Sequence, residues 1–112
     1  MRYSLYIGRF QPFHKGHKCC IQQMIEKGKK VCVAVMDIYG TEPEKNPYKY
    51  EEVLKKISED MNEEIQRGYV IITKIPPIES VNYGRNVGYD LIEHIPPDEI
   101  KEISATKIRN EL

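Results

Sequence analysis

The stretch RYSLYIGRFQPFHKGH, residues 2–17, decides how this chain is expected to fold. Residues 2–7 are rich in β-forming side chains and stop at Gly8, so we predict a strand there. Apolar residues then recur at helical spacing from about residue 16 to residue 27, and Gly28 supplies the helix stop. A strand that passes through a glycine-flanked turn into a helix is the opening of a βαβ unit.

The same alternation continues along the chain. Residues 30–36 contain the apolar run VCVAVM, which suits a strand buried on both faces, and residues 48–67 carry an apolar stripe at helical spacing. Residues 69–75 form a third predicted strand, and two short strands are predicted over residues 78–83 and 89–95. Strands that alternate with helices imply a parallel sheet with right-handed crossovers, so we predict an α/β fold.

The composition limits the class of protein. A length of 112 residues suits a single domain over residues 1–112, and a domain this small gains stability from an oligomer. Lys+Arg and Asp+Glu both total 17, which argues against a nucleic-acid-binding protein. No apolar run approaches the roughly 20 residues of a membrane-spanning helix, and the N-terminus lacks the features of a signal peptide. Cys19, Cys20 and Cys32 read as reduced thiols, so we expect a cytoplasmic protein without a membrane partner.

Cationic side chains are concentrated in the loops that follow the predicted strands. Ligands of open parallel sheets bind beyond the carboxyl ends of the strands, and helix N-termini there favour phosphate. In a chain without net charge, cations gathered at one edge indicate a polyanionic ligand such as a nucleoside triphosphate. The residues expected at this edge are Arg9, His14, Lys15, His17, Lys18, Lys45, Arg85, Lys107 and Arg109.

Structural explanations and a zinc site compete with this interpretation. Loop lysines are commonly only solvated, and a single histidine is more often structural than catalytic. Two histidines in one glycine-flanked loop are harder to explain in that way. His14 and His17 followed by Cys19 and Cys20 offer nitrogen and sulfur ligands, but the spacing matches no common zinc motif and the two cysteines fall on different sides of a helix. We therefore predict no metal site formed by protein side chains.

Three motifs resemble those of the nucleotidyltransferase superfamily. GRFQPFHKGH, residues 8–17, is similar to the GxFxPxHxGH form of its HxGH signature, and the wording GRFQPFH most resembles the nicotinamide-nucleotide adenylyltransferase branch. ISATKIR, residues 103–109, is similar to the second signature, ISxTxIR. KNPYKYEE, residues 45–52, resembles the NPFTxxER stretch that opens the central helix in those enzymes. The motifs follow in the expected order over nearly the whole chain.

The resemblance implies a fold and a reaction. The fold would be a Rossmann-like open parallel sheet of about five strands with helices on both faces. The enzyme would transfer a nucleotidyl group from a nucleoside triphosphate to a small phosphorylated acceptor and release pyrophosphate, with Mg²⁺ assisting. ATP and nicotinamide mononucleotide are the favoured substrates. The alternatives are a CTP-dependent cytidylyltransferase acting on glycerol phosphate or a similar alcohol or sugar phosphate, and a non-catalytic nucleotide-binding module.

The resemblance also implies roles for individual residues. His14 and His17 would stabilise charge at the α-phosphate, and Gly16 would let the helix N-terminus approach the nucleotide. Backbone groups beside the base and phosphates would come from Gly8, Arg9 and Phe10.

The remaining implied contacts lie further along the chain. Ser104, Thr106 and Arg109 would hold the β- and γ-phosphates, and Lys45 would contact either substrate. Arg85 is a candidate by its place in a loop at the same edge.

The chain also departs from the family pattern. Val53 follows Glu52, where relatives often carry an arginine. The carboxyl-terminal helices of larger adenylyltransferases have no counterpart, so loops 37–46 and 76–88 or a partner subunit would complete the acceptor pocket. We therefore expect a homodimer.

Overall fold

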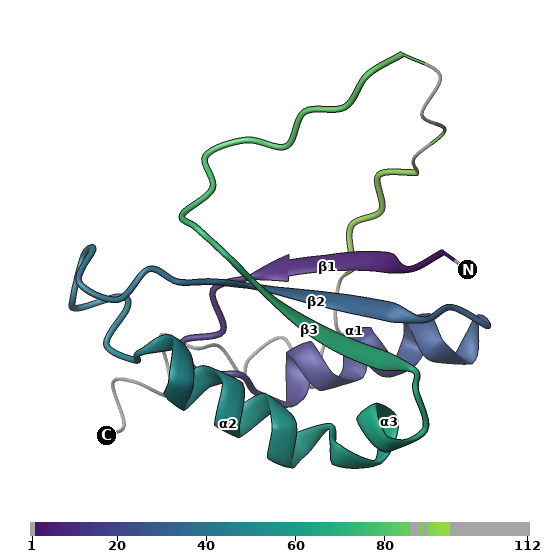
Figure 1. Ribbon diagram of the computed structural model, residues 1–112, viewed down its shortest axis with the longest axis horizontal. Coiled ribbons are helices and arrows are strands. Elements are labelled where there is room, and N and C mark those ends of the chain that lie inside the picture. The colour runs from purple at the N-terminus through teal and green to yellow at the C-terminus, as the bar shows by residue number, and fades with distance from the viewer. Residues whose placement is uncertain (1, 86–87, 89, 95–112) are drawn as a thin grey trace.

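A three-stranded parallel sheet with helices forms the described part of the protein. The computed structural model describes residues 2–85, 88 and 90–94. The sheet has the order β1-β2-β3, with both pairs parallel. The predicted α/β class and parallel sheet are confirmed, and Figure 1 shows the elements in chain order: β1 (Ser4–Gly8), α1 (Lys15–Glu26), β2 (Val31–Met36), α2 (Tyr50–Asp60), α3 (Asn62–Gln66) and β3 (Val70–Ile75).

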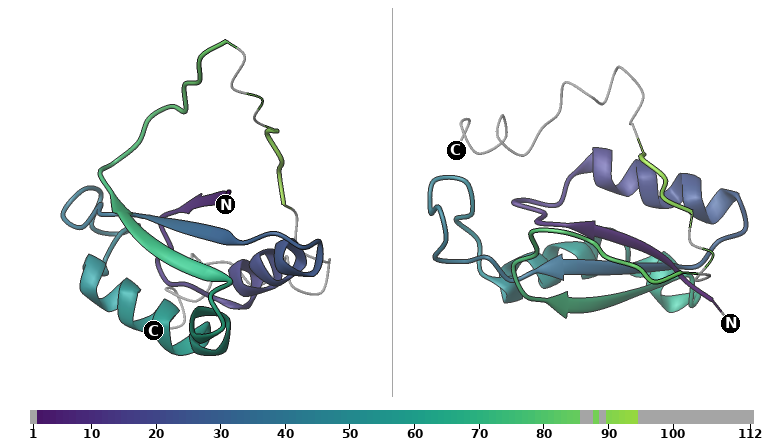
Figure 2. Two further views of the ribbon diagram at one scale, coloured as in Figure 1. Left: turned by 45° about the vertical axis from the view of Figure 1, so that its right-hand side comes forward. Right: turned by 90° about the horizontal axis from the view of Figure 1, so that it is seen from above.

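The described helices all cover the same face of the sheet (Figure 2). Both crossovers advance the sheet in one direction, from β1 to β2 and from β2 to β3. Because βαβ connections are right-handed, two steps in the same direction place their helices on the same side. We expected helices on both faces of the sheet. In the part of the chain that the structure describes, helices cover one face.

The hydrophobic core lies between the sheet and these helices. Val31, Val33 and Val35 alternate along β2 and are fully buried on the helix-covered face. The helices contribute further core side chains, namely Ile21 and Met24 from α1 and Val53, Ile57 and Met61 from α2. The apolar stripe predicted for residues 48–67 thus faces the core, although the helix divides at Met61 into α2 and α3.

None of the described helices covers the other face of the sheet (Figure 2). Leu5 and Ile71 occupy one register row there with Cys32, and they are 57% and 43% exposed. Ala34, in the next row, is buried, whereas Cys32 is half-buried. The expectation that β2 is buried on both faces therefore holds fully only for the helix-covered face.

The two short strands predicted after β3 do not form in the described residues. Residues 78–83 and 90–94 have no strand, and residues 89 and 95 lie outside the described part. The Pro76–Pro77 pair removes two N–H donors directly after β3, so the ladder cannot continue. The segment instead rises away from the sheet as an exposed arch, the green trace in Figure 1.

This arch returns to the body of the protein at His94. The His94 ring lies edge-on to the Tyr6 ring of β1 at 6.4 Å, and the Cys20 Sγ of α1 donates to the His94 carbonyl oxygen at 3.9 Å. Burial raises the pKa of the Tyr6 hydroxyl, with Cys20 as the second cause. Within residues 2–85, 88 and 90–94, no helix has the length and apolar character to cross a membrane.

Candidate functional site

The first loop, residues 9–14, turns the chain sharply between β1 and α1. Phe10 has a φ of 52° and is almost fully buried, and its ring folds back over Gly8. A Cβ atom at Gly8 would lie 2.7 Å from the Phe10 ring, so only glycine fits beneath this aromatic ring without a shift. Gly8 thus serves close packing, which explains why the strand ends at a glycine.

The two histidines of the motif cap α1 reciprocally. The Gly16 N–H donates to His14 Nδ1 at 3.0 Å, and the His14 N–H donates to His17 Nδ1 at 3.1 Å. The pair is a capping box in which imidazoles replace the usual hydroxyl and carboxylate. Because each Nδ1 accepts a hydrogen bond, each neutral ring carries its proton on Nε2. Both rings are therefore donors through Nε2.

Aromatic side chains hold the His17 ring in place. It stacks on His14 with centroids 3.9 Å apart and on Phe13 at 5.4 Å, while Phe10 meets it edge-on at 4.9 Å. Burial lowers the pKa of His14, and burial together with the nearby His14 lowers the pKa of His17 to about 3. At neutral pH both rings are uncharged, so the site presents two N–H donors of fixed orientation rather than two cations.

Cationic side chains surround the outer side of His14. A cavity of about 520 Å³ between the start of α1 and the middle of α2 is lined by His14, Lys15, Lys18 and Lys56, together with Asp60, Pro12 and Phe13. The Lys56 Nζ is paired with Asp60 Oδ2 at 2.6 Å. Lys15 and Lys18 thus supply positive charge beside the histidines at the N-terminus of α1.

The second loop, residues 37–49, lies between β2 and α2 and carries Lys45. The Lys45 side chain is 65% exposed and forms an ion pair with Glu42 at 3.5 Å. Gln11 of the first loop connects to this loop, because the Tyr48 N–H donates to Gln11 Oε1 at 2.8 Å and Gln11 Nε2 donates to the Tyr48 carbonyl at 3.1 Å. Sequence reasoning missed both Gln11 and Phe13, although both lie inside the GRFQPFHKGH motif.

The structure brings part of the predicted site together. The end of β1, the first loop and the first turn of α1 together hold Gly8, Arg9, Phe10, His14, Gly16 and His17, with the Arg9 side chain exposed. The Phe10 side chain belongs to the core, so a ligand contact there is left to its backbone, as predicted.

The structure does not add the remaining predicted residues to this group. Arg85 is exposed in the segment that follows β3, and among the described residues no hydrogen bond or ring contact joins it to His14 or His17. Ser104, Thr106 and Arg109 lie outside the described residues.

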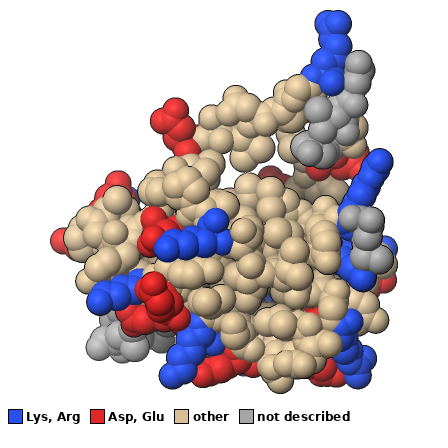
Figure 3. All heavy atoms as spheres, in the orientation of Figure 1, with Lys and Arg blue, Asp and Glu red and all other residues tan. Residues whose placement is uncertain are grey.

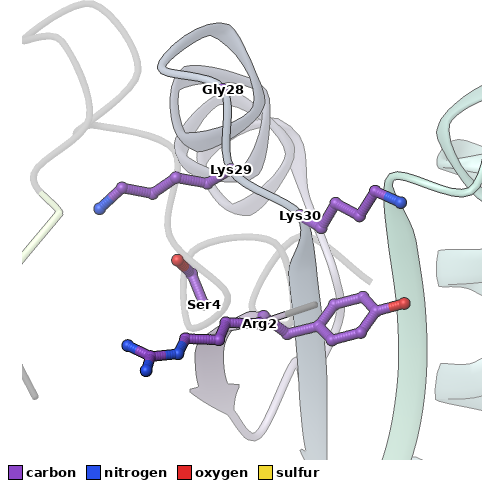
Figure 4. Close-up of a pocket in the computed structure, with 6 residues that line it drawn as sticks. Arg2, Ser4, Gly28, Lys29 and Lys30 are labelled. Atoms are coloured by element: carbon purple, nitrogen blue, oxygen red, sulfur yellow. The ribbon is translucent and has the colours of Figure 1, made fainter.

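A second, smaller cavity lies at the opposite edge, where β1 and β2 begin. It measures about 320 Å³ and is lined by Arg2, Tyr3, Ser4, Gly28, Lys29 and Lys30. Figure 4 shows Arg2 and Lys29 extending to one side and Lys30 to the other, so these cations do not converge on one point. On the face seen in Figure 3, Lys and Arg alternate with Asp and Glu and form no basic stripe.

Comparison with known proteins gives this arrangement a family. Residues 5–71, from β1 into β3, match the family model described as cytidylyltransferase-like. The chain belongs to the cytidylyltransferase-like family. The match includes both loops at the carboxyl edge of the sheet, and it confirms the predicted resemblance at the level of the family.

Individual members of this family are similar over different parts of the chain. A nicotinamide-nucleotide adenylyltransferase of Methanolobus tindarius is 33% identical over 77% of this chain. The chain spans only 58% of the length of that relative. A protein of the same name from Methanocorpusculum labreanum is 24% identical over the whole chain and 80% of its own length.

A solved structure agrees with the fold. The crystal structure of a bifunctional NMN adenylyltransferase/ADP ribose pyrophosphatase from Francisella tularensis aligns with a TM-score of 0.57 and 34% sequence identity. The alignment covers 65% of this chain and 22% of that protein. The likeness confirms the α/β fold class for the part aligned.

Proposed function

We propose that this protein is a nucleotidyltransferase that transfers an adenylyl group from ATP to a small phosphorylated acceptor, with nicotinamide mononucleotide favoured, and releases pyrophosphate. The observation that carries the proposal is the pair of uncharged histidines, His14 and His17, whose Nδ1 atoms accept backbone hydrogen bonds at the N-terminus of α1 and so leave the ring proton on Nε2 as a donor. The names of the similar archaeal proteins support ATP and the nicotinamide mononucleotide acceptor.

The reaction matches what these residues offer. An oxygen of the acceptor phosphate attacks the α-phosphorus, a new P–O bond forms, and the bond to the oxygen bridging to the β-phosphorus breaks as pyrophosphate leaves with the electron pair. The attacking phosphate is already ionised, so the reaction needs no general base. Nε2–H donors from His14 and His17 would stabilise negative charge on the α-phosphate as it develops. Lys15, Lys18 and Lys45 would offset the charge of the two anionic substrates.

Mg²⁺ fits this reaction as a companion of the triphosphate. The described residues hold no group of three His, Cys, Asp or Glu side chains arranged to bind a metal ion. Mg²⁺ is commonly held by substrate phosphates and water with few protein ligands, so such a protein needs no cage of its own. When bound, Mg²⁺ would neutralise charge on the phosphates.

A CTP-dependent cytidylyltransferase is the second candidate. The description of the matching family and the place of Lys45 before the central helix favour it. The acceptor would then be glycerol phosphate or a similar alcohol or sugar phosphate. A non-catalytic nucleotide-binding module is the third outcome.

One screen separates these functions. The purified protein is incubated with ATP or CTP, Mg²⁺ and a panel of phosphorylated acceptors, and pyrophosphate release is measured. We expect turnover with ATP and nicotinamide mononucleotide, and we expect EDTA to abolish it and added Mg²⁺ to restore it. Turnover only with CTP would select the cytidylyltransferase. Nucleotide binding without turnover by any pair would select the binding module.

The homodimer and the cytoplasmic location stay predictions. The sheet face that no described helix covers has Leu5 and Ile71 exposed, which offers an apolar surface that a second subunit could cover. Light scattering of the purified protein would decide the oligomeric state. All three cysteines are free thiols, which suits a reducing compartment.

A further inference from the structure

Gln11 forms a hydrogen-bonded bridge between the first loop and the second loop. Its side chain is only 3% exposed. The amide oxygen accepts from the Tyr48 N–H at 2.8 Å, and the amide nitrogen donates to the Tyr48 carbonyl at 3.1 Å. These two hydrogen bonds join the two loops, and both come from one side chain.

The amide is also oriented from within its own loop. Gln11 Nε2 lies 3.5 Å from the Arg9 carbonyl oxygen, so the donor end of the side chain points at two backbone carbonyls. The Gln11 amide accepts from the N–H and donates to the C=O of the same residue, which is the pair of hydrogen bonds that a neighbouring β-strand would make with that residue. A side chain with a single donor or acceptor cannot reproduce the contact.

The second loop behaves as one unit because it is braced internally. The Thr41 hydroxyl donates to the Ile38 carbonyl at 2.6 Å, and the backbone N–H groups of Lys45 and Asn46 donate to the Glu42 carbonyl at 2.9 and 3.0 Å. The buried Asn46 side chain donates to the Thr41 carbonyl at 2.9 Å. Fixing the end of such a loop therefore fixes its other residues as well.

We propose that Gln11 is a positioning residue, which sets the second loop and its Lys45 against His14 of the first loop and His17 of α1, so that both loops face the same substrates. Tyr48, the residue that Gln11 holds, is three positions from Lys45 in the sequence. The residues before His14 in the motif thus serve to align a neighbouring loop as well as to form the turn. The functional part of this inference rests on the proposed transferase activity, whereas the loop alignment does not.

The test compares Gln11→Met with Gln66→Met. Methionine has nearly the length of glutamine but makes neither hydrogen bond, and Gln66 is an exposed residue of α3 that serves as the matched control. Hydrogen exchange is followed at the Tyr48 amide, in the second loop and at Val33 in the core. We expect Gln11→Met to raise exchange at Tyr48 and in the second loop by about tenfold or more, with Val33 and the control unchanged. Unchanged exchange at Tyr48, or an equal rise at Val33, would overturn the inference.

A second variant guards against a general loss of structure. A protonated carboxyl group in Gln11→Glu has one O–H donor and one C=O acceptor, as the amide does. The ionised form has no donor and sets a negative charge against the Tyr48 carbonyl oxygen, so it should push the two loops apart even though it can still accept a hydrogen bond. The protection factor of the Tyr48 amide in this variant should be low at pH 8 and approach the wild-type value near pH 5. The wild type should show no such change between these pH values. A Gln11→Glu protection factor that does not recover at low pH would contradict the proposed bridge.

The kinetic test addresses function. In Gln11→Met the substrate would have to order the second loop when it binds, and this cost weakens binding. KM for one or both substrates should therefore rise about tenfold, while kcat stays within about threefold of wild type. A loss of kcat with unchanged KM, or no change in either, would overturn the positioning role. If the wild-type protein shows no turnover, the proposed function fails, and hydrogen exchange alone then decides whether Gln11 fixes the second loop.

Discussion

The first loop and the second loop leave adjacent parallel strands at the same edge of the sheet, but they are stabilised in different ways. The first loop places Phe10 and Phe13 in the core and packs both against the His17 ring. The second loop exposes most of its side chains, apart from the buried Ile38 and Asn46, and is held by backbone and side-chain hydrogen bonds within itself. The first loop therefore depends on side-chain shape, and the second depends on backbone geometry and on the bridge from Gln11.

This difference predicts how each loop responds to substitution. A change in the first loop alters packing and functional groups together, because the aromatic residues that fill the core also support the histidines. A change at an exposed residue of the second loop should affect ligand contacts with little effect on folding. The four predictions below test this contrast.

Loss of the His17 imidazole should have the largest effect. We expect His17→Ala to lower turnover by roughly two to three orders of magnitude, the scale for removal of one transition-state donor. Pyrophosphate release at saturating substrates is the measurement. His94→Ala is the matched control, because His94 lies in the arch and its ring contacts Tyr6 of β1. A near wild-type rate in His17→Ala would remove this histidine from the proposed mechanism.

The glycine that lies beneath Phe10 should matter next. A Cβ in Gly8→Ala meets the Phe10 ring at 2.7 Å, so the ring must move, and we expect a loss of about 1–3 kcal/mol in unfolding free energy along with reduced turnover. Gly40 in the second loop has a φ of 92° and open space around it, so Gly40→Ala should cost about 1 kcal/mol and leave turnover near wild type. Denaturant unfolding of both variants measures the difference. Equal losses of turnover would contradict the contrast between the loops.

Lys45 should show a smaller effect, confined to binding. Its side chain is exposed and pairs with the exposed Glu42, so Lys45→Ala should leave the melting temperature unchanged. We expect about a tenfold rise in KM for one substrate, because an exposed cation contributes a modest charge-assisted contact. The exposed Lys55 on α2 provides the control variant, Lys55→Ala. An unchanged KM for both substrates would exclude the predicted contact.

The pH dependence of stability should show the smallest effect. Burial lowers the pKa of His17 from 6.5 to about 3, so between these pH values the unfolded chain binds a proton that the folded chain does not. Stability from this residue is complete above pH 6.5 and is lost as the pH falls toward 3, and His14 acts in the same direction.

The slope of the melting temperature against pH tests this linkage. Over pH 7 to 4 the wild type should lose stability more steeply than His17→Gln, which has no titrating ring at this position. The slope is the informative quantity, because the substitution also alters the helix cap. Equal slopes would show that the pKa of His17 is not lowered in the folded protein.

Much of this architecture could be predicted from the sequence because it depends on local patterns. The alternation of apolar residues located β1, β2, β3 and the helices to within a few residues, and the HxGH wording placed the histidines at the start of α1. The helical stripe of residues 48–67 was also correct, apart from its division at Met61. These features require only neighbouring residues and their periodicity.

Other features depend on contacts between distant segments and could not be predicted. Residues 78–83 have an apolar pattern suited to a strand, but a strand also needs a partner, and the arch leaves the sheet after Pro76. The bridge from Gln11 to Tyr48 spans 37 positions and has no periodicity to reveal it. The Nε2 tautomer of both histidines likewise follows only from the reciprocal cap.

The reciprocal cap on α1 has an entropic consequence. Neither the His14 ring nor the His17 ring can rotate without releasing a backbone N–H of the first helical turn. Folding therefore fixes the side-chain torsions of both histidines before any ligand binds. An anion that accepts hydrogen bonds from their two N–H groups then does not have to order either side chain, so binding carries no further loss of entropy from these two rings. Local melting of the first turn of α1 would free both rings at once, so the lifetime of a bound anion at this site should follow the opening rate of that turn.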